Sequence, residues 1–559
     1  MNRYLTGIFC SFSIFVLTQS ASAQEKGKDQ NVIGQTEDKV KMFNAQQAYF
    51  KGDYVKAVNI YKEVLKDKPN DANLLFHVGQ VYFAMEQYED AVENLEKAES
   101  IDPKANDDLM YFLGRVHHVM GNTDKAKTEY ENFKKNINSE AKSKEYEIDF
   151  LIQQCVTATD LVAHPVDAKV ENAGDMINSS YDDKAPSMTA DGKTLVFTSR
   201  RPAGKSGQSV DKEGDFKYFD DIYQAKWDDA KQTWIEADII KGPVNTDEHD
   251  ACTSISPDGK QLFIYRNNAT DAHGGEIFVS KAQQSGKWGS PKNIGKPISS
   301  SYVELGACIS SDGQRLFFVT ERPKGKTPEQ KGFGQSDIWM CTRATKTTWG
   351  PPINLGPDIN TAMDEGGIFL HPDGKTLFFS SDGHNTMGGY DVFMTRYENG
   401  KWSKPVNLGY PINSVRDDKN FVLSTDNQTG YFDSNRPNGT GERDIYKVDM
   451  SKYPIMGDDG KKDTGPKVSI LKGTVIISES GQGTEATVVI KDKETGAEVA
   501  RTTSSPEGEY FFTLPSDKKY IIEVDQKGFV KVSEDFALVS DKKGTSTLVK
   551  HLLLNKEKK

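Results

Sequence analysis

This chain has few cysteines and few long apolar runs. Its acidic residues outnumber its basic ones. Five of its 559 residues are cysteines, and no two of them form a Cys-x-x-Cys pair. Without that spacing, the sequence does not indicate a zinc or dithiol redox site of the usual kind. The formal net charge of −12 argues against a general nucleic-acid-binding protein, because such proteins attract phosphates with clustered Lys and Arg.

The one marked apolar run lies at the N-terminus. Arg3 precedes the apolar stretch Ile8–Leu17, and the small residues Ala21-Ser22-Ala23 follow it. This order predicts an export signal over residues 1–23 that is cleaved before Gln24. The run is shorter than the roughly 20 residues that a membrane-spanning helix needs. We therefore expect a soluble protein of the periplasm, at most associated with the outer membrane and peripheral to it.

Residues 37–157 follow a polar stretch at 24–36, taken as a linker, and have a helical pattern with a period of 34. Pro69 and Pro103 mark the period, and the middle copy carries Gly79, Tyr82, Ala91, Leu95, Ala98 and Pro103. These residues resemble the tetratricopeptide repeat, in which small side chains let paired helices approach closely. We expect Lys144–Val156 to be the capping helix that such arrays require. The resemblance implies a groove for a peptide or helix of a partner protein. The alternative is that the helices only pack on the next domain.

A second repeat begins further along the chain. Five times, an acidic residue stands eight positions before the aspartate of a tight turn, and a strand of alternating apolar residues follows. The acids are Asp183, Asp250, Glu304, Glu365 and Asp418, and the turn residues are Asp191, Asp258, Asp312, Asp373 and Asp426. A period of roughly 50–67 residues with several strands in each unit predicts a five-bladed, all-β propeller over residues 164–449.

The fifth unit lacks its own fourth strand. In the other units this strand begins at a tryptophan and continues into a Pro-x-Asn-Leu-Gly or related sequence. Val170–Gly174 and Ile177-Asn178-Ser179 match Val406–Gly409 and Ile412-Asn413-Ser414 of the fourth unit. We therefore expect the N-terminal segment to complete the last blade, which would remove the exposed sheet edges of an open ring.

The turn sequences carry a family resemblance. Ser256–Lys260 and His371–Lys375, together with triplets such as Asp221-Ile222-Tyr223, resemble the PD40 or WD40-like repeats of TolB-type propellers. A linker is expected at 450–466. The alternating strands at 467–556 resemble the carboxypeptidase regulatory-like domain, a transthyretin-like β-sandwich without peptidase machinery. The expected fold is thus multidomain: an α-helical repeat array, a five-bladed propeller and a small β-sandwich.

The five repeated acids are the candidate site residues. If Asp183, Asp250, Glu304, Glu365 and Asp418 gather at one channel mouth, their repulsion calls for a divalent cation, Ca²⁺ or Mg²⁺, or for a basic residue of a partner. The structural alternative is that each acid pairs with backbone N–H groups or an arginine of a neighbouring blade. A second set of acids opens each third strand, and we expect these to pair with Arg200, Arg266, Arg322 and Arg436.

The four cysteines that follow the predicted signal have two interpretations. They are Cys155, Cys252, Cys308 and Cys341. Cys252 and Cys308 fall on the innermost strands of adjacent repeats, where a small apolar side chain suits the packing. The sequence therefore favours buried free thiols, and a disulfide is the alternative in an oxidising compartment.

Catalytic signatures are missing. The sequence contains no Gly-x-Ser-x-Gly elbow and no His-Glu-x-x-His motif, and Gly289–Lys296 lacks the spacing and the Ser/Thr of a phosphate-binding loop. We expect no enzymatic activity and no bound cofactor, apart from the cation named above. A propeller hydrolase, the remaining catalytic alternative, would need a nucleophile and a base in the channel.

The order of the three parts resembles PorE-class envelope proteins of Bacteroidetes. That resemblance implies a non-catalytic scaffold of the type IX secretion or gliding machinery. Its partners would be envelope or secretion-system proteins, held by the tetratricopeptide groove and a propeller face. Those proteins usually end in an OmpA-like domain, whereas this sequence stops at Lys559, so peptidoglycan binding is not carried over. The alternative function is a receptor for carbohydrate or peptidoglycan fragments that uses the propeller face.

Overall fold

The computed structural model describes residues 29–137, 140–202, 210–211, 217–267, 274–323, 332–453, 455–456, 462–463, 467–540 and 545–557. The chain divides into two compact units between residues 156 and 157. The predicted signal segment, residues 1–23, lies outside the described residues. Among the helices that are described, none combines the length and the apolar character needed to cross a membrane.

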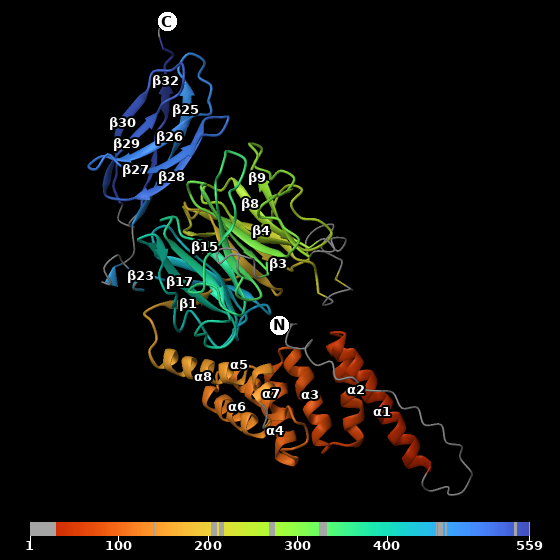
Figure 1. Cartoon of the computed structure of the whole chain (residues 1–559). Coiled ribbons are helices and arrows are strands. Elements are labelled where there is room, and N and C mark those ends of the chain that lie inside the picture. The colour runs from red at the N-terminus through yellow and green to blue at the C-terminus, as the bar shows by residue number, and fades with distance from the viewer. Residues whose placement is uncertain are drawn as a thin grey trace. The chain divides into compact units, whose positions relative to one another are not determined.

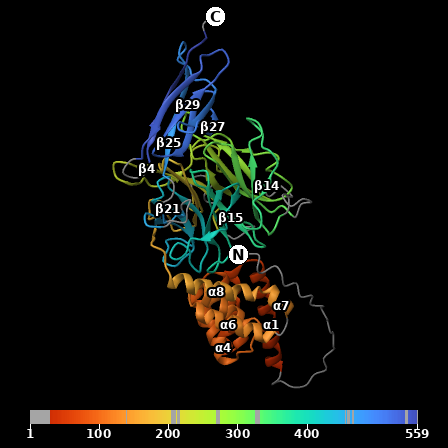
Figure 2. The same cartoon turned by 60° about the vertical axis from the view of Figure 1, so that its left-hand side comes forward.

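The first unit consists of helices (Figures 1 and 2). Their bounds are α1 Asp29–Phe50, α2 Tyr54–Asp67, α3 Ala72–Ala84, α4 Tyr88–Ile101, α5 Leu109–Val119, α6 Thr123–Ile137, α7 Glu140–Glu145 and α8 Ile148–Ala163. Two expectations need correction. Helix α1 begins inside the stretch taken as a linker at 24–36. The capping segment expected at Lys144–Val156 is two helices, since α7 ends at Glu145 and α8 continues to Ala163.

Small residues set the close packing of the helix pairs, as the repeat pattern predicts. A Cβ atom on Gly79 of α3 would lie 2.6 Å from Leu95 Cγ of α4. A Cβ atom on Gly114 of α5 would lie 2.5 Å from the Tyr130 ring of α6. Neither neighbour leaves room for a larger residue. These two pairs therefore each close around one glycine and one large buried side chain.

In the second unit, five antiparallel sheets form the propeller blades (Figure 1). Blade one contains β2 Asp183–Met188, β3 Thr194–Ser199, β4 Asp221–Asp228, β5 Thr233–Trp234 and β6 Asp238–Ile239. Blade two contains β7 Asp250–Ile255, β8 Gln261–Arg266, β9 Glu276–Lys281 and β10 Lys292–Asn293. Blade three contains β11 Glu304–Ile309, β12 Arg315–Thr320, β13 Asp337–Thr342 and β14 Ile353–Asn354.

The remaining blades follow the same order. Blade four contains β15 Glu365–Leu370, β16 Thr376–Ser381, β17 Asp391–Glu398, β18 Lys401–Trp402 and β19 Val406–Asn407. Blade five contains β20 Asp418–Leu423, β21 Thr429–Ser434, β22 Asp444–Asp449 and, from the start of the unit, β1 Lys169–Asn172. Apolar side chains of adjacent blades share cores. Trp234 of blade one, for example, donates its indole N–H to Tyr431 Oη of blade five at 3.0 Å.

Strand β1 closes the ring, which confirms the prediction from the sequence. It pairs antiparallel with β22, with Lys169 opposite Asp449 and Asn172 opposite Tyr446. The Asn178 side chain then bonds both backbone groups of Ile445, donating to its oxygen at 2.8 Å and accepting from its nitrogen at 2.9 Å. The last blade is thus held by the first residues of the unit.

The fourth strand of the blades differs from the expectation of one continuous strand. In blade four, Trp402 ends the short strand β18, and β19 pairs separately with β17. Pro405 lies between the two strands. Because proline has no N–H to donate, it interrupts the ladder there. Prolines occupy the corresponding gap in blades two and three as well.

The turn after each inner strand requires a left-handed residue next to its aspartate. Glycine fills that place in four blades, for example Gly259 with φ +73°. In blade five the residue is Asn427, with φ +58°. Asparagine is one of the few non-glycine residues that tolerate this conformation. This explains how the fifth turn keeps its shape without glycine.

The C-terminal part of the second unit is a sandwich of two sheets. One contains β25 Val468–Ile477, β28 Glu509–Pro515, β31 Thr547–Val549 and β32 Leu552–Leu554. The other contains β26 Thr487–Asp492, β27 Glu498–Thr503, β29 Lys518–Val524 and β30 Val532–Leu538. The stretch expected to be a linker, 450–466, includes a short pair, β23 Ile455–Met456 with β24 Lys462–Asp463.

Candidate functional site

The five repeated acids occupy equivalent places in the ring. Each is the first residue of an innermost strand, and each is fully buried; they are Asp183, Asp250, Glu304, Glu365 and Asp418. Burial of a charged carboxylate is costly unless hydrogen bonds and an opposite charge replace water. The contacts of these side chains therefore decide between a ligand site and an internal support.

A Ser or Thr four residues before each acid supplies the first of these contacts. In blade five, Ser414 donates both its backbone N–H, at 2.7 Å, and its hydroxyl, at 2.8 Å, to Asp418 Oδ2. The same double contact recurs in every blade, from Ser179, Thr246, Ser300 and Thr361. We did not predict this role from the sequence, although a Ser or Thr stands at that spacing all five times.

An arginine of the same blade completes the contacts in four of the five blades. Arg436 Nη2 lies 2.5 Å from Asp418 Oδ1, and the same guanidinium donates to the Ile412 carbonyl at 2.7 Å. The other pairs are Arg201 with Asp183, Arg266 with Asp250, and Arg322 with Glu304. The structure thus corresponds to the internal-support alternative, but each arginine comes from the same blade and not, as we expected, from a neighbouring one. We call this the arginine clamp.

Blade four lacks the arginine clamp. His384 takes the place of the arginine, and its Nε2 bonds the Ile359 carbonyl at 2.9 Å. The Glu365 carboxyl instead accepts hydrogen bonds from Thr361 and Ser381. Burial lowers the pKa of His384, which keeps its imidazole group neutral. Burial also raises the pKa of Glu365 to about 8. At neutral pH the protonated form of Glu365 therefore predominates, which removes the need for a counter-ion.

The acids that open the third strands do not pair with these arginines, contrary to our expectation. Asp391 instead accepts from the Met387 N–H at 2.9 Å and from Asn407 Nδ2 at 2.6 Å. Corresponding asparagines contact Glu276, Asp337 and Asp444. In blade one, Ile239 lies where the other blades have asparagine, and burial raises the pKa of Asp221 to about 6.

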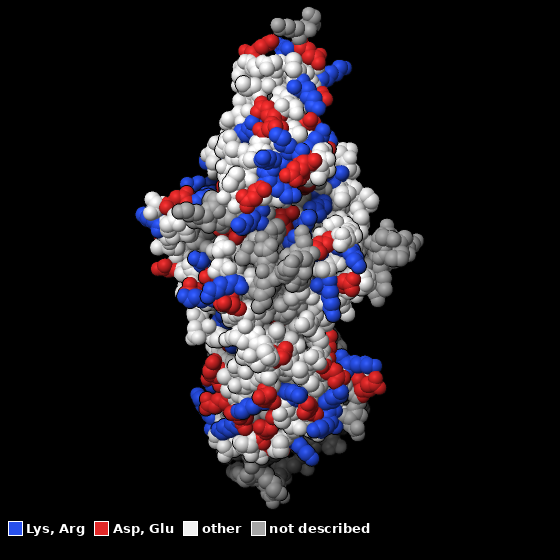
Figure 3. All heavy atoms as spheres, turned by 90° about the vertical axis from the view of Figure 1, so that its left-hand side faces the viewer, with Lys and Arg blue, Asp and Glu red and all other residues white. Residues whose placement is uncertain are grey.

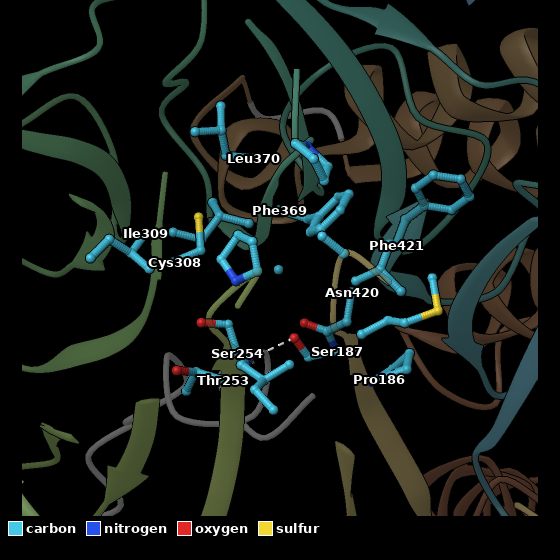
Figure 4. Close-up of a pocket in the computed structure, with 18 residues that line it drawn as sticks. Pro186, Ser187, Thr253, Ser254, Cys308, Ile309, Phe369, Leu370, Asn420 and Phe421 are labelled. Carbon is cyan, nitrogen blue, oxygen red and sulfur yellow. Dashed lines mark hydrogen bonds between the residues drawn. The ribbon is translucent and has the colours of Figure 1, made fainter. Parts of the chain in front are cut away.

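The central cavity of the ring is lined by the inner strands β2, β7, β11, β15 and β20 (Figure 4). Ser187, Ser254, Cys308 and Phe369 are among the residues that line it, from four of these strands. None of the described lining residues is acidic or basic. The repeated acids therefore do not line this cavity. Across the described residues, no group of three or more Asp, Glu, His or Cys side chains is placed to hold a metal ion.

The four cysteines that follow residue 28 are buried free thiols, as the sequence favoured. Burial raises the pKa of Cys308 to about 12 and that of Cys341 to about 11. A thiol with so high a pKa is almost entirely protonated at neutral pH, and the thiolate is the reactive form. These side chains therefore serve packing.

In the helical unit, α3 and α5 share one face. Phe76 and Phe83 of α3 both contact the Phe112 ring of α5, at 5.7 and 5.9 Å between centroids. The Arg115 guanidinium lies 5.7 Å from the Phe83 ring and 5.8 Å from the Tyr111 ring. Phe83 and Arg115 are half-buried. This face thus offers a cation and aromatic surface together, the side-chain types favoured at protein-binding surfaces.

Charge is mixed on one face of the molecule. On the face drawn in Figure 3, Lys and Arg are interspersed with Asp and Glu. Neither sign forms one large patch there. The described residues of that face therefore form no basic track of the kind that follows a nucleic-acid backbone.

Comparison with known proteins identifies the helical repeats. The tetratricopeptide repeat family matches residues 82–132. Among solved structures, the Sgt2 TPR domain from Aspergillus fumigatus is 23% identical, with a TM-score of 0.20. That match covers 23% of this chain and 83% of the other. No curated protein matches the sequence. The family match supports a tetratricopeptide region and names no partner.

Two further structures are similar over about half of the chain. An α-L-arabinofuranosidase from Lactobacillus brevis is 15% identical, with a TM-score of 0.33, and the match covers 53% of this chain and 98% of that one. The α-L-arabinofuranosidase PaAbf62A from Podospora anserina is 10% identical, with a TM-score of 0.32, and the match covers 49% and 94%. At this level of similarity, neither neighbour informs the function of this chain.

Proposed function

We propose that this protein is a non-catalytic scaffold that binds a peptide or helix of a partner protein on the α3–α5 face. The observation that carries the proposal is the tetratricopeptide array itself, with Arg115 lying over Phe83 and Tyr111 where its helices α3 and α5 meet. Tetratricopeptide arrays present extended concave binding surfaces. The ring supports the same conclusion, because its buried acids are engaged in holding the blades together.

The setting we propose is the periplasm, as an accessory component of type IX secretion or gliding machinery. The apolar stretch and small-residue site before Gln24 support export. The order of helical repeats, propeller and sandwich supports a role among envelope proteins. Fractionation of cells that express the tagged protein tests the location. Recovery from the cytoplasm with residues 1–23 retained would contradict it.

The binding face is tested by affinity purification from envelope fractions. We expect the wild-type chain to retain secretion or gliding components and Arg115→Glu to lose them, because reversal of the charge removes the cation over the two rings. Lys125→Glu on α6, where the side chain is 65% exposed, is the matched control and should retain them. Circular dichroism checks that the helices remain folded. Equal recovery with both variants would contradict this face as the site.

A further inference from the structure

One face of α1 is apolar and exposed. Val40, Phe43 and Phe50 have 55%, 60% and 58% of their surface exposed. The opposite face carries Ala45 and Ala48, which are buried in the core of the helical unit. Helix α1 has 22 residues, against 14 in its partner α2. An end helix of a repeat array normally has a polar outer face. The exposed apolar stripe of Val40, Phe43 and Phe50 is therefore expected to pack against another surface.

The spacing of the stripe indicates what kind of cover fits. Val40, Phe43, Gln47 and Phe50 are separated by three, four and three residues, and all four are exposed. Steps of three and four are those of the a and d positions in a heptad, the seam by which one helix packs against another. A polar residue at a single a position, here Gln47, is a device that fixes register in such pairs. The face is therefore suited to a second helix with the same spacing.

The flanking charges favour another copy of α1 in the antiparallel direction. Glu37 and Lys51 are both exposed and stand beside the two ends of the stripe. If Val40 lies opposite Phe50 of a second copy, Glu37 comes beside that copy's Lys51. The two-fold axis makes the pair twice. In a parallel pairing, by contrast, Lys51 would lie beside the neutral Gln46 of the other helix.

From these observations we propose that the exposed stripe of α1 is a homodimer interface, in which two copies of the chain pair through an antiparallel two-helix coiled coil. The apolar residues supply the attraction, because pairing removes them from water. The Glu37–Lys51 contacts set the direction and the register. This interface involves neither the α3–α5 face nor the ring, so it is independent of the proposed partner binding.

The oligomeric state of the full chain tests the interface. We expect sedimentation velocity to show a dimer at roughly 100 µM. In the double variant Phe43→Glu and Phe50→Glu, the dissociation constant should rise by about a hundredfold or more, because four carboxylates enter the apolar seam. Val162→Glu on α8, another exposed apolar position at 48%, is the matched control and should dimerise normally. A monomeric wild-type chain, or a dimer that survives the double variant, would overturn the proposal.

Charge reversal tests the register without touching the apolar residues. Glu37→Lys and Lys51→Glu should each weaken the dimer by about fivefold, because each creates two like-charge contacts. Combining the two should restore wild-type affinity, since the opposite charges meet again. If the combined variant is weaker than either single variant, the antiparallel register is wrong. If neither single variant has an effect, the flanking charges do not face each other and the proposal fails.

Discussion

The propeller and the helical array differ in whether their ends are covered. The ring returns to its beginning: β1 supplies the last strand of blade five, and the closing ladder runs from Lys169 to Asn172. The helical array remains open, and its first helix leaves Phe43 and Phe50 exposed. A closed ring buries its own edges, whereas an open array must obtain cover from outside. Partner binding is thus expected first from the helices.

A second contrast lies within the ring. Four blades hold a buried acid with an arginine, and blade four holds Glu365 with hydroxyl and backbone groups beside a neutral His384. In the four blades with an arginine, the acid keeps its charge, which the arginine neutralises. In blade four, protonation removes the charge of Glu365. The two kinds of blade should therefore respond differently to mutation and to pH.

Deletion of residues 164–180 should have the largest effect. It removes β1 and the Asn178 bonds to Ile445, and it exposes β22 as an edge strand. We expect a loss of about 5 kcal/mol or more, which lowers the Tm of the ring by roughly 10 °C. Scanning calorimetry of the full chain measures this, and the helical transition serves as the internal control. Unchanged melting of the ring would show that β1 does not close it.

Arg436→Met should cause the second-largest loss of stability. It leaves the fully buried Asp418 without its counter-ion, and loss of one partner of a buried pair costs about 3–5 kcal/mol. Urea denaturation of the ring measures the change. Adding Asp418→Asn to Arg436→Met should recover a large part of it, because the unpaired charge is gone. If the single substitution has no effect, the clamp does not contribute to stability.

Gly114→Ala should destabilise the helical unit by about 1–3 kcal/mol through overpacking, because the new Cβ would lie 2.5 Å from the fully buried Tyr130 ring. Thermal denaturation followed by helical circular dichroism measures it. Gly366→Ala is the matched control in the ring, where the new Cβ meets nothing within 4 Å. Equal effects of the two substitutions would contradict the packing explanation.

Glu365→Gln should change the pH dependence of the ring. The pKa of Glu365 is raised to about 8 in the folded chain and lies near 4.3 in an unfolded one. Its stabilising contribution is therefore complete at low pH and is lost as the pH rises through 8, by at most about 1.4 kcal/mol per pH unit. Denaturation at pH 6 and pH 8 should show this fall for the wild-type chain and a smaller one for Glu365→Gln. Identical profiles would mean that Glu365 is charged at both values.

Much of the ring could be predicted from residues near one another in the sequence. The inner strands follow from alternating apolar residues, and the turns follow from the Asp-Gly pairs with positive φ. Closure could be predicted because Ile177-Asn178-Ser179 repeats Ile412-Asn413-Ser414. Each of these patterns is local or is a copy of another segment. Such patterns can be recognised without knowing which side chains are in contact.

The pairing of the charged residues could not be predicted in the same way. Arg200 and Arg201 are adjacent, yet Arg201 reaches Asp183 while Arg200 bonds Asp220. Which of the two turns inward depends on the path of the chain beyond β3. The fixed spacing of Ser414 before Asp418, repeated in every blade, was the missed clue. It indicates an acid that is bound by its own preceding turn.

The pairing of β1 with β22 also means that two paired strands are synthesised at different times. Asp449 follows its partner Lys169 by 280 residues, since 449 − 169 = 280. At about 5–20 residues per second, β1 is made roughly 15–60 s before the strand that will receive it. During that interval its backbone groups have no ladder to join. The nascent chain must therefore keep this segment out of wrong pairings until the final blade arrives.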